Sequence, residues 1–448
     1  MDFMVILQLA IVLAAIFLGA RLGSIGIGYA GGLGVLVLAL MGVKPGSIPI
    51  DVILVIMSVI AAIGAMQVAG GIDFLVVITE KFLRKHPKYI TYLAPIVTYF
   101  MTLMAGTGHT AFSTLPVIAE VAKEQGVRPS RPLSIAVVSS QIAITASPIS
   151  AAVVFFSGVL EKEGIPVGYL DILMICIPTT LLAVILTSFL ANFLGKELKD
   201  DPVYLDRLAK GLVVMRGVSN IKVTPMGKRS VWIFLFAIVV VMLYATLISD
   251  KVGLFGDVSK GAWFPKESIP MIRDHAIYVI MLSAATAITF FCRIDAANVL
   301  SASTFKSGMS ACVCILGVAW LGTTFVGAHE AGIKELSEGV LRTQPWLLAV
   351  ALFFASMLLY SQAATARALM PLAITVGAAP VTLVASFAAV SALFVLPTYP
   401  TLLAAVEMDD TGSTRIGKYV FNHPFFIPGV VCIALAVLFG FMFAPIVL

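Results

Sequence analysis

Apolar runs long enough to cross a lipid bilayer recur from one end of this chain to the other, with short polar segments between them. A helix needs about 20 such residues to cross a hydrocarbon core about 30 Å thick. Backbone groups in lipid have to be satisfied within helices or closed barrels. The predicted helical spans cover residues 3–20, 22–43, 52–70, 133–160, 172–194, 231–248, 275–292, 307–326, 381–406 and 425–447. The expected fold class is therefore an all-α polytopic membrane protein.

Two further apolar segments, 89–121 and 345–379, are predicted to form re-entrant helical hairpins. Basic residues flank the first of them on both sides, and residues 89–119 contain no Lys, Arg, Asp or Glu. Two arms of about 15 residues, each residue rising about 1.5 Å, reach only about 23 Å. Because this length is shorter than the hydrocarbon core, a hairpin that enters and leaves on one side is favoured over two full spans.

The two hairpins contain a short repeated pattern. At an offset of 255 positions, Thr110 aligns with Thr365 and Pro116 aligns with Pro371. Each hairpin is followed by another apolar segment that prolines interrupt, at residues 147–148 in one half and 397–400 in the other. Corresponding interrupted segments in two halves of a chain indicate the binding site of a secondary transporter. The alternative is a pair of unrelated proline kinks.

The number of spans predicts two inverted-topology repeats. Residues 1–194 form the first and residues 231–448 the second, and each contains three spans, one hairpin and two further spans. Five crossings are an odd number, so the two halves must have opposite orientations and their hairpins must enter from opposite faces. The hairpins and the proline-broken helices are then expected to meet at the bilayer midplane.

The distribution of Lys and Arg orients the spans. The linker 195–230 is basic, and basic loops favour the cytoplasm, which places both termini in the periplasm. The first apolar run is preceded by Asp2 and followed by Arg21. A signal peptide has the opposite polarity, so an uncleaved span is expected. For Asp409 and Asp410 a solvated loop is favoured over the alternative of a coupling or partner site.

The composition agrees with a membrane protein and excludes several other classes. Hydrophobic residues make up 60% of the chain and charged residues 12%, half the usual share in a soluble domain. The net charge of +5 resides in loops and orients the spans, so no nucleic-acid partner is predicted. The five cysteines lie in spans or at their ends, and the spacing of Cys312 and Cys314 does not suit a zinc pair. Neither a metal nor a cofactor is predicted.

Arg367 is the strongest functional signal in the sequence. It is the only charged residue between Arg342 and Glu407. An arginine at membrane depth costs about 3 kcal/mol or more, so its default interpretation is functional. We expect it to bind an anion. The alternative is a structural arginine that snorkels to an interface or bonds to helix carbonyls.

The hairpin tips and helix breaks supply the remaining candidates. Interrupted helices present N-termini whose free N–H groups suit carboxylates, and neutral side chains add further donors. One arginine together with helix ends suits a small dianion. The predicted substrate-binding residues are Gly106, Thr107, Gly108, His109, Thr110, Ser147, Pro148, Ser150, Ser361, Gln362, Thr365, Arg367, Thr398, Tyr399 and Thr401.

Several motifs in these segments resemble those of one family. They are GTG at 106–108, QIAITASPIS at 141–150, YSQAATA at 360–366, LPTYPT at 396–401 and MDDTG at 408–412. Together they resemble the Dcu family of anaerobic C4-dicarboxylate transporters, most closely its A type, over the whole chain. The resemblance implies an inner-membrane carrier of Gram-negative bacteria that exchanges or takes up fumarate, succinate, malate and aspartate. The wider ion-transporter superfamily implies a homodimer.

His109 departs from the family pattern, in which a small polar residue such as Asn is expected after Gly-Thr-Gly. Two interpretations are open. His109 either tunes the pH dependence of transport or is a hydrogen-bonded structural residue.

The isolated charge of Arg367 favours exchange as the transport mode. An empty site would carry an unpaired cation through a medium of low dielectric, whereas a bound dicarboxylate offsets that charge. A Na⁺- or H⁺-coupled symporter is the alternative, because unwound backbone near the two breaks could bind Na⁺. An intramembrane enzyme is disfavoured, since the sequence contains no His-Glu-x-x-His or Gly-x-Ser-x-Gly motif. A channel is disfavoured because the sequence has no repeated charged ring.

Overall fold

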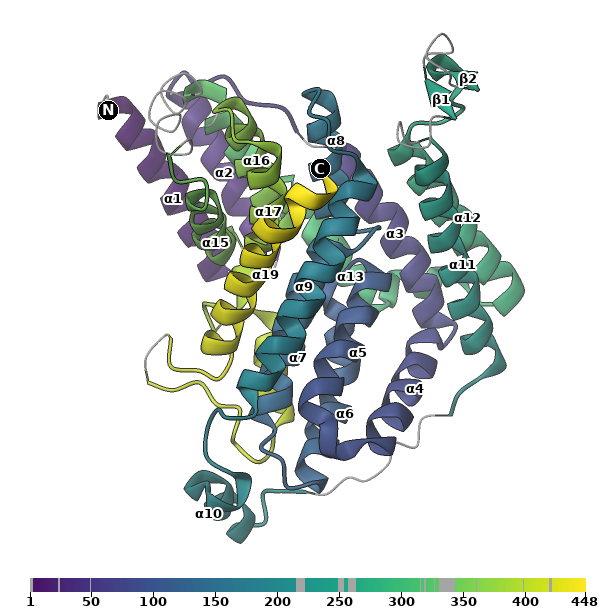
Figure 1. Ribbon diagram of the computed structural model, residues 1–448, viewed down its shortest axis with the longest axis vertical. Helices are drawn as coiled ribbons and strands as arrows, with labels where there is room; N and C mark the ends of the chain where they lie inside the picture. The colour runs from purple at the N-terminus through teal and green to yellow at the C-terminus, as the bar shows by residue number, and fades with distance from the viewer. Residues whose placement is uncertain are drawn as a thin grey trace.

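The computed structural model describes residues 3–22, 25–48, 50–214, 222–248, 254–256, 263–314, 316–317, 320–325, 327–329, 343–359, 361–397, 399–418 and 421–448. Almost all of the regular structure in these residues is helical, which confirms the predicted all-α class (Figure 1). The exception is a parallel pair of two-residue strands, β1 (Phe255–Gly256) and β2 (Phe264–Pro265).

The first half contains nine α-helices in its described residues. They are α1 (Phe3–Leu22), α2 (Gly26–Leu40), α3 (Ile50–Val68), α4 (Gly71–Lys85), α5 (Ile90–Ala105), α6 (Ala111–Glu124), α7 (Ser130–Ile142), α8 (Ala151–Lys162) and α9 (Tyr169–Ala191). Short 3-10 turns lie among them, η1 (Pro87–Tyr89), η2 (Gly108–Thr110) and η3 (Ala143–Ala146). Helices α5 and α6 occupy the segment where a hairpin is predicted, and their turn contains Gly106.

The linker and the second half follow. The linker contains η4 (Leu198–Asp200) and α10 (Pro202–Ala209). The elements after it are α11 (Pro225–Leu247), η6 (Lys266–Ser268), α12 (Arg273–Cys292), η7 (Ala296–Ser301), α13 (Ser303–Cys314), α15 (Leu347–Leu359), α16 (Gln362–Thr375), α17 (Pro380–Ser386), η9 (Phe387–Phe394), α18 (Pro400–Met408) and α19 (Phe426–Val447). Helix α11 begins inside the predicted linker because Thr224 caps it and Pro225 occupies its first position.

Among the described residues, five helices are long and apolar enough to cross a membrane. They are the broken helix Ser130–Lys162, which comprises α7, η3 and α8, together with Tyr169–Ala191, Pro225–Leu247, Asp274–Cys292 and Phe426–Val447. A further pair, Ile53–Val68 and Gly71–Lys85, passes the same test together but is bent by 73°. Gly70 at the bend has a φ of +84°, a left-handed conformation that suits glycine. Residues 71–85 therefore continue the third predicted span as a helix.

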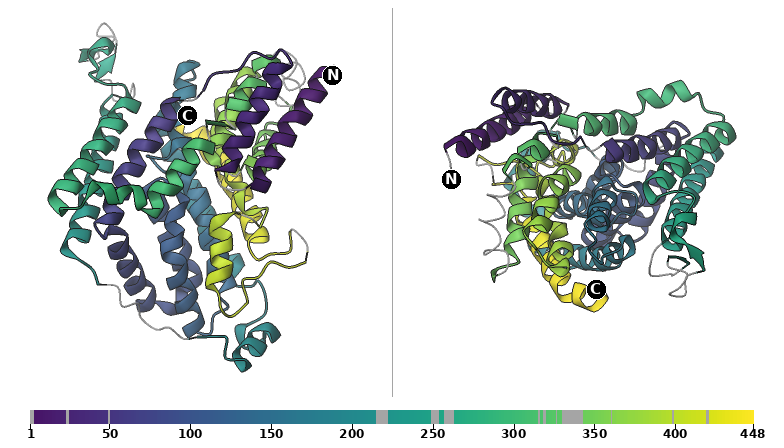
Figure 2. Two further views of the ribbon diagram at one scale, coloured as in Figure 1. Left: turned by 180° about the vertical axis from the view of Figure 1, so that it is seen from behind. Right: turned by 90° about the horizontal axis from the view of Figure 1, so that it is seen from above.

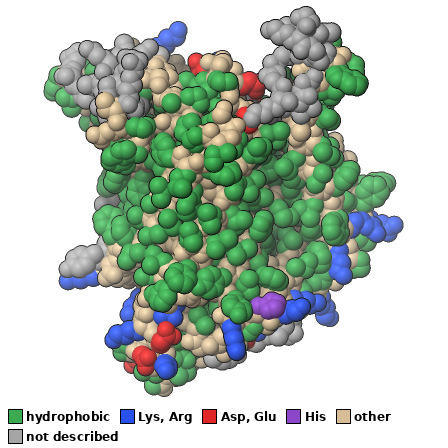
Figure 3. All heavy atoms as spheres, in the orientation of Figure 1, with side chains coloured by type: hydrophobic (Ala, Val, Ile, Leu, Met, Phe, Trp, Pro, Cys, Tyr) green, Lys and Arg blue, Asp and Glu red, His purple; other side chains and the backbone are tan. Residues whose placement is uncertain are grey.

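The helices form one bundle with a scaffold on either flank. Seen from above, α11 and α12 stand on one side and α1 and α2 on the opposite side, with α5 to α9 between them (Figure 2). The face in Figure 3 is hydrophobic over most of its height, and Lys and Arg side chains gather toward the end where α10 lies. This pattern is typical of a protein whose middle contacts lipid.

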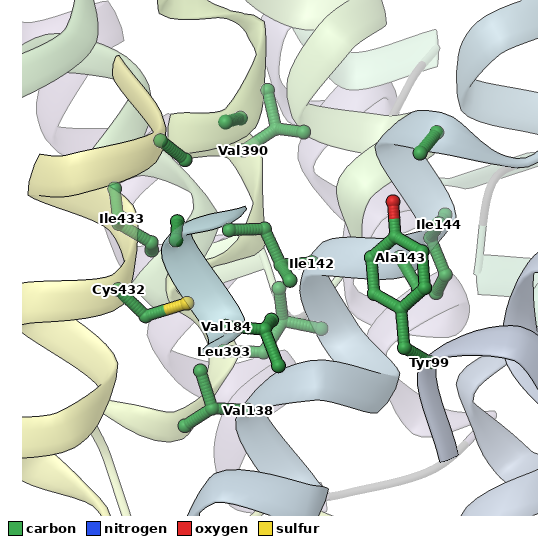
Figure 4. Packing of buried hydrophobic residues seen from close by; sticks show 14 of the residues in the cluster. Tyr99, Val138, Ile142, Ala143, Ile144, Val184, Val390, Leu393, Cys432 and Ile433 are labelled. Atoms are coloured by element: carbon green, nitrogen blue, oxygen red, sulfur yellow. The ribbon is translucent and has the colours of Figure 1, made fainter. Parts of the chain in front are cut away.

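Two proline-broken helices cross in the centre of the bundle. In the first, Ser147 precedes Pro148 and is extended, with φ −82° and ψ 126°, because a residue before proline avoids the helical region. In the second, Tyr399 precedes Pro400 and is extended for the same reason. Elements α7 and η3 of the first broken helix pack against η9 of the second, and Ile142 and Leu393 belong to this buried cluster (Figure 4).

Ion pairs with little exposure to solvent connect α6, the linker and the segment after α18 at the basic end of the molecule. Lys123, at the end of α6, pairs with Glu120 at 2.9 Å and with Asp410 at 3.0 Å. Arg128 pairs with Asp201 of the linker at 2.5 Å. Burial alone raises the pKa of Asp201, but a backbone N–H and the charge of Arg128 lower it by more, so its pKa lies below the ordinary value.

The prediction of a solvated loop at residues 409–410 is wrong for Asp409. Its side chain is buried and accepts hydrogen bonds from the backbone N–H groups and hydroxyls of the residues that follow it, which are Thr411, Ser413 and Thr414. These bonds compensate the carboxylate for its lost hydration.

Candidate functional site

Arg367 lies in α16, the second arm of the hairpin formed by α15 and α16, and is 2% exposed. Its guanidinium carbon is 5.2 Å from the centre of the Phe155 ring on α8. None of its three guanidinium nitrogens has a hydrogen-bond partner among the residues that the structure describes. The structure therefore gives no support to the alternative of an arginine bonded to helix carbonyls.

A cavity of about 190 Å³ opens beside Arg367. One water needs only about 10–15 Å³ measured in this way, so the cavity has room for a small organic ion. The lining consists of Thr323, Gly327, Arg367, Ala368, Pro371, Leu372 and Thr375, and among these described residues only Arg367 is charged. The second hairpin thus forms one wall, and Thr323 and Gly327 lie on the other side.

The electrostatics of this arrangement favour an anionic ligand. An unpaired charge in the interior carries a desolvation penalty of several kcal/mol that a partner of opposite charge offsets. The cation–π contact with Phe155 returns only about 2 kcal/mol when it is desolvated. A carboxylate, like a phosphate, can accept two parallel hydrogen bonds from one guanidinium. The site is therefore chemically suited to a carboxylate.

The tip of the first hairpin packs against the first broken helix. Gly106 has a φ of +67°, and a Cβ built there would lie 2.9 Å from a side-chain carbon of Ile149. A Cβ on Gly108 would lie 2.9 Å from the backbone oxygen of Ser140. The Thr110 hydroxyl lies 3.0 Å from that of Thr102. Thr107 and the backbone of His109 lie in the same tight turn.

The hydroxyls at the first break brace the backbone that the break frees. Ser147 donates to the backbone oxygen of Leu103 at 2.6 Å. Ser150 donates to the backbone oxygen of Ile144 at 2.7 Å and caps α8. The backbone oxygen of Pro148 accepts a hydrogen bond from the hydroxyl of Tyr169. These side chains therefore hold the irregular backbone in a buried setting.

The tip of the second hairpin contacts the first broken helix directly. Ser361 caps α16 by accepting from the backbone N–H of Ala364 at 3.2 Å. Thr365 donates back to the oxygen of Ser361 at 2.8 Å. Gln362 donates from Nε2 to the backbone oxygen of Gln141 at 3.1 Å. This last bond joins elements that are 221 positions apart in the chain.

At the second break, Thr401 is fully buried in the first turn of α18, and its hydroxyl has no partner within the described ranges. Tyr399 is 9% exposed and precedes that helix. Thr398 lies outside the described residues. Helix α18 packs on α6 and α7, so this break adjoins the first hairpin rather than the cavity beside Arg367.

Gln141 is a buried polar residue that the sequence analysis did not place among the site residues. It is 1% exposed, and neither its amide nitrogen nor its amide oxygen has a partner in the part of the chain that the structure describes. Such groups are rare in folded proteins and call for an explanation. Gln141 could have been identified by the same signal as Arg367, because each is a strongly polar residue inside an apolar segment.

The described residues contain no group of three or more His, Cys, Asp or Glu side chains that could hold a metal ion.

Comparison with known proteins gives the family. The sequence model of the anaerobic C4-dicarboxylate membrane transporters matches residues 4–448. The C4-dicarboxylate transporter DcuA of Wolinella succinogenes is 64% identical over 446 residues, which cover 99% of this chain and 100% of that protein. The DcuA protein of Escherichia coli K12 is 61% identical with the same coverage. The anaerobic C4-dicarboxylate transporter DcuB of Escherichia coli O6:H1 is 35% identical over 452 residues, with 98% of each chain covered.

A solved structure shares the fold. The YdaH transporter of Alcanivorax borkumensis superposes with a TM-score of 0.59, and the match covers 99% of this chain and 98% of that chain. Its sequence identity is 14%, so the likeness concerns the fold alone. The fold and the family agree on a multi-pass membrane protein, and the proteins of the family are transporters rather than enzymes. The chain belongs to the Dcu family of anaerobic C4-dicarboxylate membrane transporters and is of the A type.

Proposed function

We propose that this protein is a secondary transporter that moves C4-dicarboxylates across the bacterial inner membrane. The observation that carries the proposal is the buried guanidinium of Arg367, which lacks a hydrogen-bond partner among the described residues and lies beside a cavity of about 190 Å³. The family supports it, because the named relatives are C4-dicarboxylate transporters. Fumarate, succinate, malate and aspartate are the proposed substrates.

Arg367 binds one carboxylate of the substrate in this proposal. The other carboxylate is held by neutral donors and helix ends at the two hairpin tips and the first break, where many of the remaining predicted site residues lie. The hydroxyls that already hold backbone groups, such as those of Ser147 and Ser150, shape the site instead of contacting the substrate. This division of roles is testable residue by residue.

Exchange is the proposed transport mode, with fumarate or aspartate entering as succinate leaves. An empty carrier would have to move the unpaired Arg367 charge through a medium of low dielectric. In a loaded carrier a carboxylate of the substrate compensates the Arg367 charge while the site moves. The step that returns the empty site is therefore disfavoured, and flux in one direction requires flux in the other.

The architecture proposed for this mechanism is a pair of inverted repeats, 1–194 and 231–448, joined by the linker 195–230. The hairpins support it, because the open end of α5 and α6 lies toward the basic end and that of α15 and α16 toward the opposite end (Figure 1). Both chain ends lie in the half of the molecule away from α10. With the linker in the cytoplasm, both termini are periplasmic. A homodimer is the proposed assembly, on the ground of the superfamily alone.

Counterflow in proteoliposomes tests this function. Vesicles containing the purified protein are loaded with unlabelled succinate, and labelled fumarate or aspartate is added outside without an ion gradient. Accumulation that disappears when the internal dicarboxylate is omitted supports exchange. Uptake that requires a Na⁺ or proton gradient and ignores internal substrate would support the symporter instead. Absence of any dicarboxylate uptake would contradict the proposed function.

A further inference from the structure

Gln141 lies where both hairpin tips meet the first broken helix. The backbone oxygen of Ser140 faces Gly108 of the first hairpin, and the backbone oxygen of Gln141 accepts the hydrogen bond from Gln362 of the second. The side chain of Gln141 is 1% exposed, and its amide nitrogen and oxygen both lack a partner among the described residues. A buried amide nitrogen or oxygen without a hydrogen bond costs about 1–3 kcal/mol each. A ligand that bonds to both groups would remove this cost.

Two elements that pack against α7, the helix of Gln141, contain other unsatisfied groups. They are η9 and α18. Each has one buried hydroxyl that lacks a partner within the described ranges, on Ser391 and Thr401 respectively. Ser391 lies at a kink of η9, where its φ and ψ are −103° and 17°. Both broken helices thus contain buried polar groups that a polar ligand could complete.

Arg367 and the residue that contacts Gln141 both lie on α16. Gln362, whose side chain donates to the backbone oxygen of Gln141, precedes Arg367 by five positions, or about 7.5 Å of helix rise and about 140° around the helix. Side chains on a helix lean toward its N-terminus, which brings the guanidinium back toward the level of Gln362. Phe155, which faces the guanidinium, lies just beyond the 147–150 break on the broken helix to which Gln141 belongs.

We propose that the Gln141 amide recognises the substituent on the second carbon of the dicarboxylate, and so favours substrates that have an ammonium or hydroxyl group there. This inference rests on the proposed function. The amide oxygen accepts from an ammonium or a hydroxyl, and the amide nitrogen donates to a hydroxyl or a carboxylate oxygen. A substrate without that substituent leaves the amide oxygen unsatisfied. Aspartate and malate gain from this contact, whereas fumarate and succinate do not.

The test compares the Gln141→Leu and Gln141→Glu variants with the wild type in proteoliposomes loaded with succinate. The half-saturating concentrations of external aspartate, malate, fumarate and succinate are measured for each. Gln141→Leu is expected to fold, because replacing an unpartnered buried amide by an apolar side chain of similar size is close to neutral. Gln67→Leu is the matched control, since Gln67 accepts hydrogen bonds from Thr304 in the scaffold.

The expected result is a selective change. In Gln141→Leu the apparent affinity for aspartate and malate falls by roughly 10-fold or more relative to that for fumarate. This is the loss expected for one hydrogen bond to a charged or polar group. Gln141→Glu keeps the side-chain shape and a hydrogen-bond acceptor, and its affinity for aspartate falls less than its affinity for malate. Gln67→Leu leaves the substrate ratios unchanged. A parallel loss of all four substrates, or no change in the ratios, overturns the assignment.

Binding without transport gives an independent measurement. The increase in melting temperature caused by each dicarboxylate is measured for the purified wild type and Gln141→Leu proteins in detergent. Loss of the shift with aspartate, together with retention of the shift with fumarate, supports the proposal. An equal shift with both substrates contradicts it. A wild type that neither transports nor binds any dicarboxylate contradicts the proposed function itself, and this outcome is seen before any variant is made.

Discussion

Replacing Arg367 by Gln is predicted to abolish substrate binding and to stabilise the empty protein. The guanidinium is 2% exposed and has no hydrogen-bond partner among the described residues, so the variant removes an uncompensated buried charge. That charge costs several kcal/mol, and the contact with Phe155 offsets about 2 kcal/mol of it. The melting temperature of the unliganded variant should therefore equal or exceed that of the wild type.

The loss in affinity follows from the bonds that a carboxylate would make. Two parallel hydrogen bonds to a charged group contribute about 3 kcal/mol or more together. Each 1.4 kcal/mol corresponds to about a tenfold change, so the half-saturating dicarboxylate concentration should rise about 100-fold or more. Arg367→Lys keeps the charge but loses the two-pronged geometry, and it should recover only part of the affinity.

The assay measures both quantities on one preparation. Melting temperatures are recorded with and without succinate, and counterflow is measured at several substrate concentrations. Arg293→Gln is the matched control, because Arg293 is exposed at the end of α12. Wild-type counterflow in a correctly inserted Arg367→Gln protein would refute the anion site. A large drop in the melting temperature of the empty variant would refute the view that this charge is uncompensated.

Three further predictions concern the framework of the site. Gly106→Ala should lower the melting temperature and slow transport, because φ is +67° there and the new Cβ would crowd Ile149; the expected cost of about 1–3 kcal/mol is measured by denaturation. Lys123→Met should destabilise the basic end by about 1–3 kcal/mol, since it leaves the Asp410 carboxylate, whose side chain is 17% exposed, without this cation. The double variant with Asp410→Asn should recover part of that loss. The pKa of Asp201 is lowered in the folded protein, so its contribution to stability is complete above the unfolded pKa of about 3.9. That contribution is lost as the pH falls through the lower folded pKa. The difference in melting temperature between the wild type and Asp201→Asn should therefore shrink over that acidic range.

The sequence predicted the parts of the fold that have a strong local cause. The breaks before Pro148 and Pro400 follow from the restricted backbone of residues that precede proline, and the helices follow from apolar runs. The bend at Gly70 was not predicted. Two adjacent glycines permit a left-handed residue, but only packing decides whether the helix continues after it. The structure shows that it does, as α4.

The candidate site divides in the same way. Arg367 could be found because one charge in a long apolar segment has no structural rationale in the sequence. The hydroxyls could be found, but their partners could not. Ser150, for example, bonds to a backbone oxygen six positions earlier, which depends on the shape of the break. Asp409 was misassigned for a related reason, because the donors that surround it come from a turn whose geometry the sequence does not specify.

The hydrogen bonds also explain why so few groups remain for a ligand. Breaking a helix at membrane depth frees backbone groups that lipid cannot satisfy, and Ser147 and Ser150 are occupied with that task. The buried polar groups that have no partner in the described part of the chain, among them those of Arg367 and Gln141, are then the ones that a substrate can complete. Binding then supplies hydrogen-bond partners to the carrier and to the substrate together. The empty carrier retains the free-energy cost of its unsatisfied groups, whereas the loaded carrier does not, and this difference favours exchange over net flux.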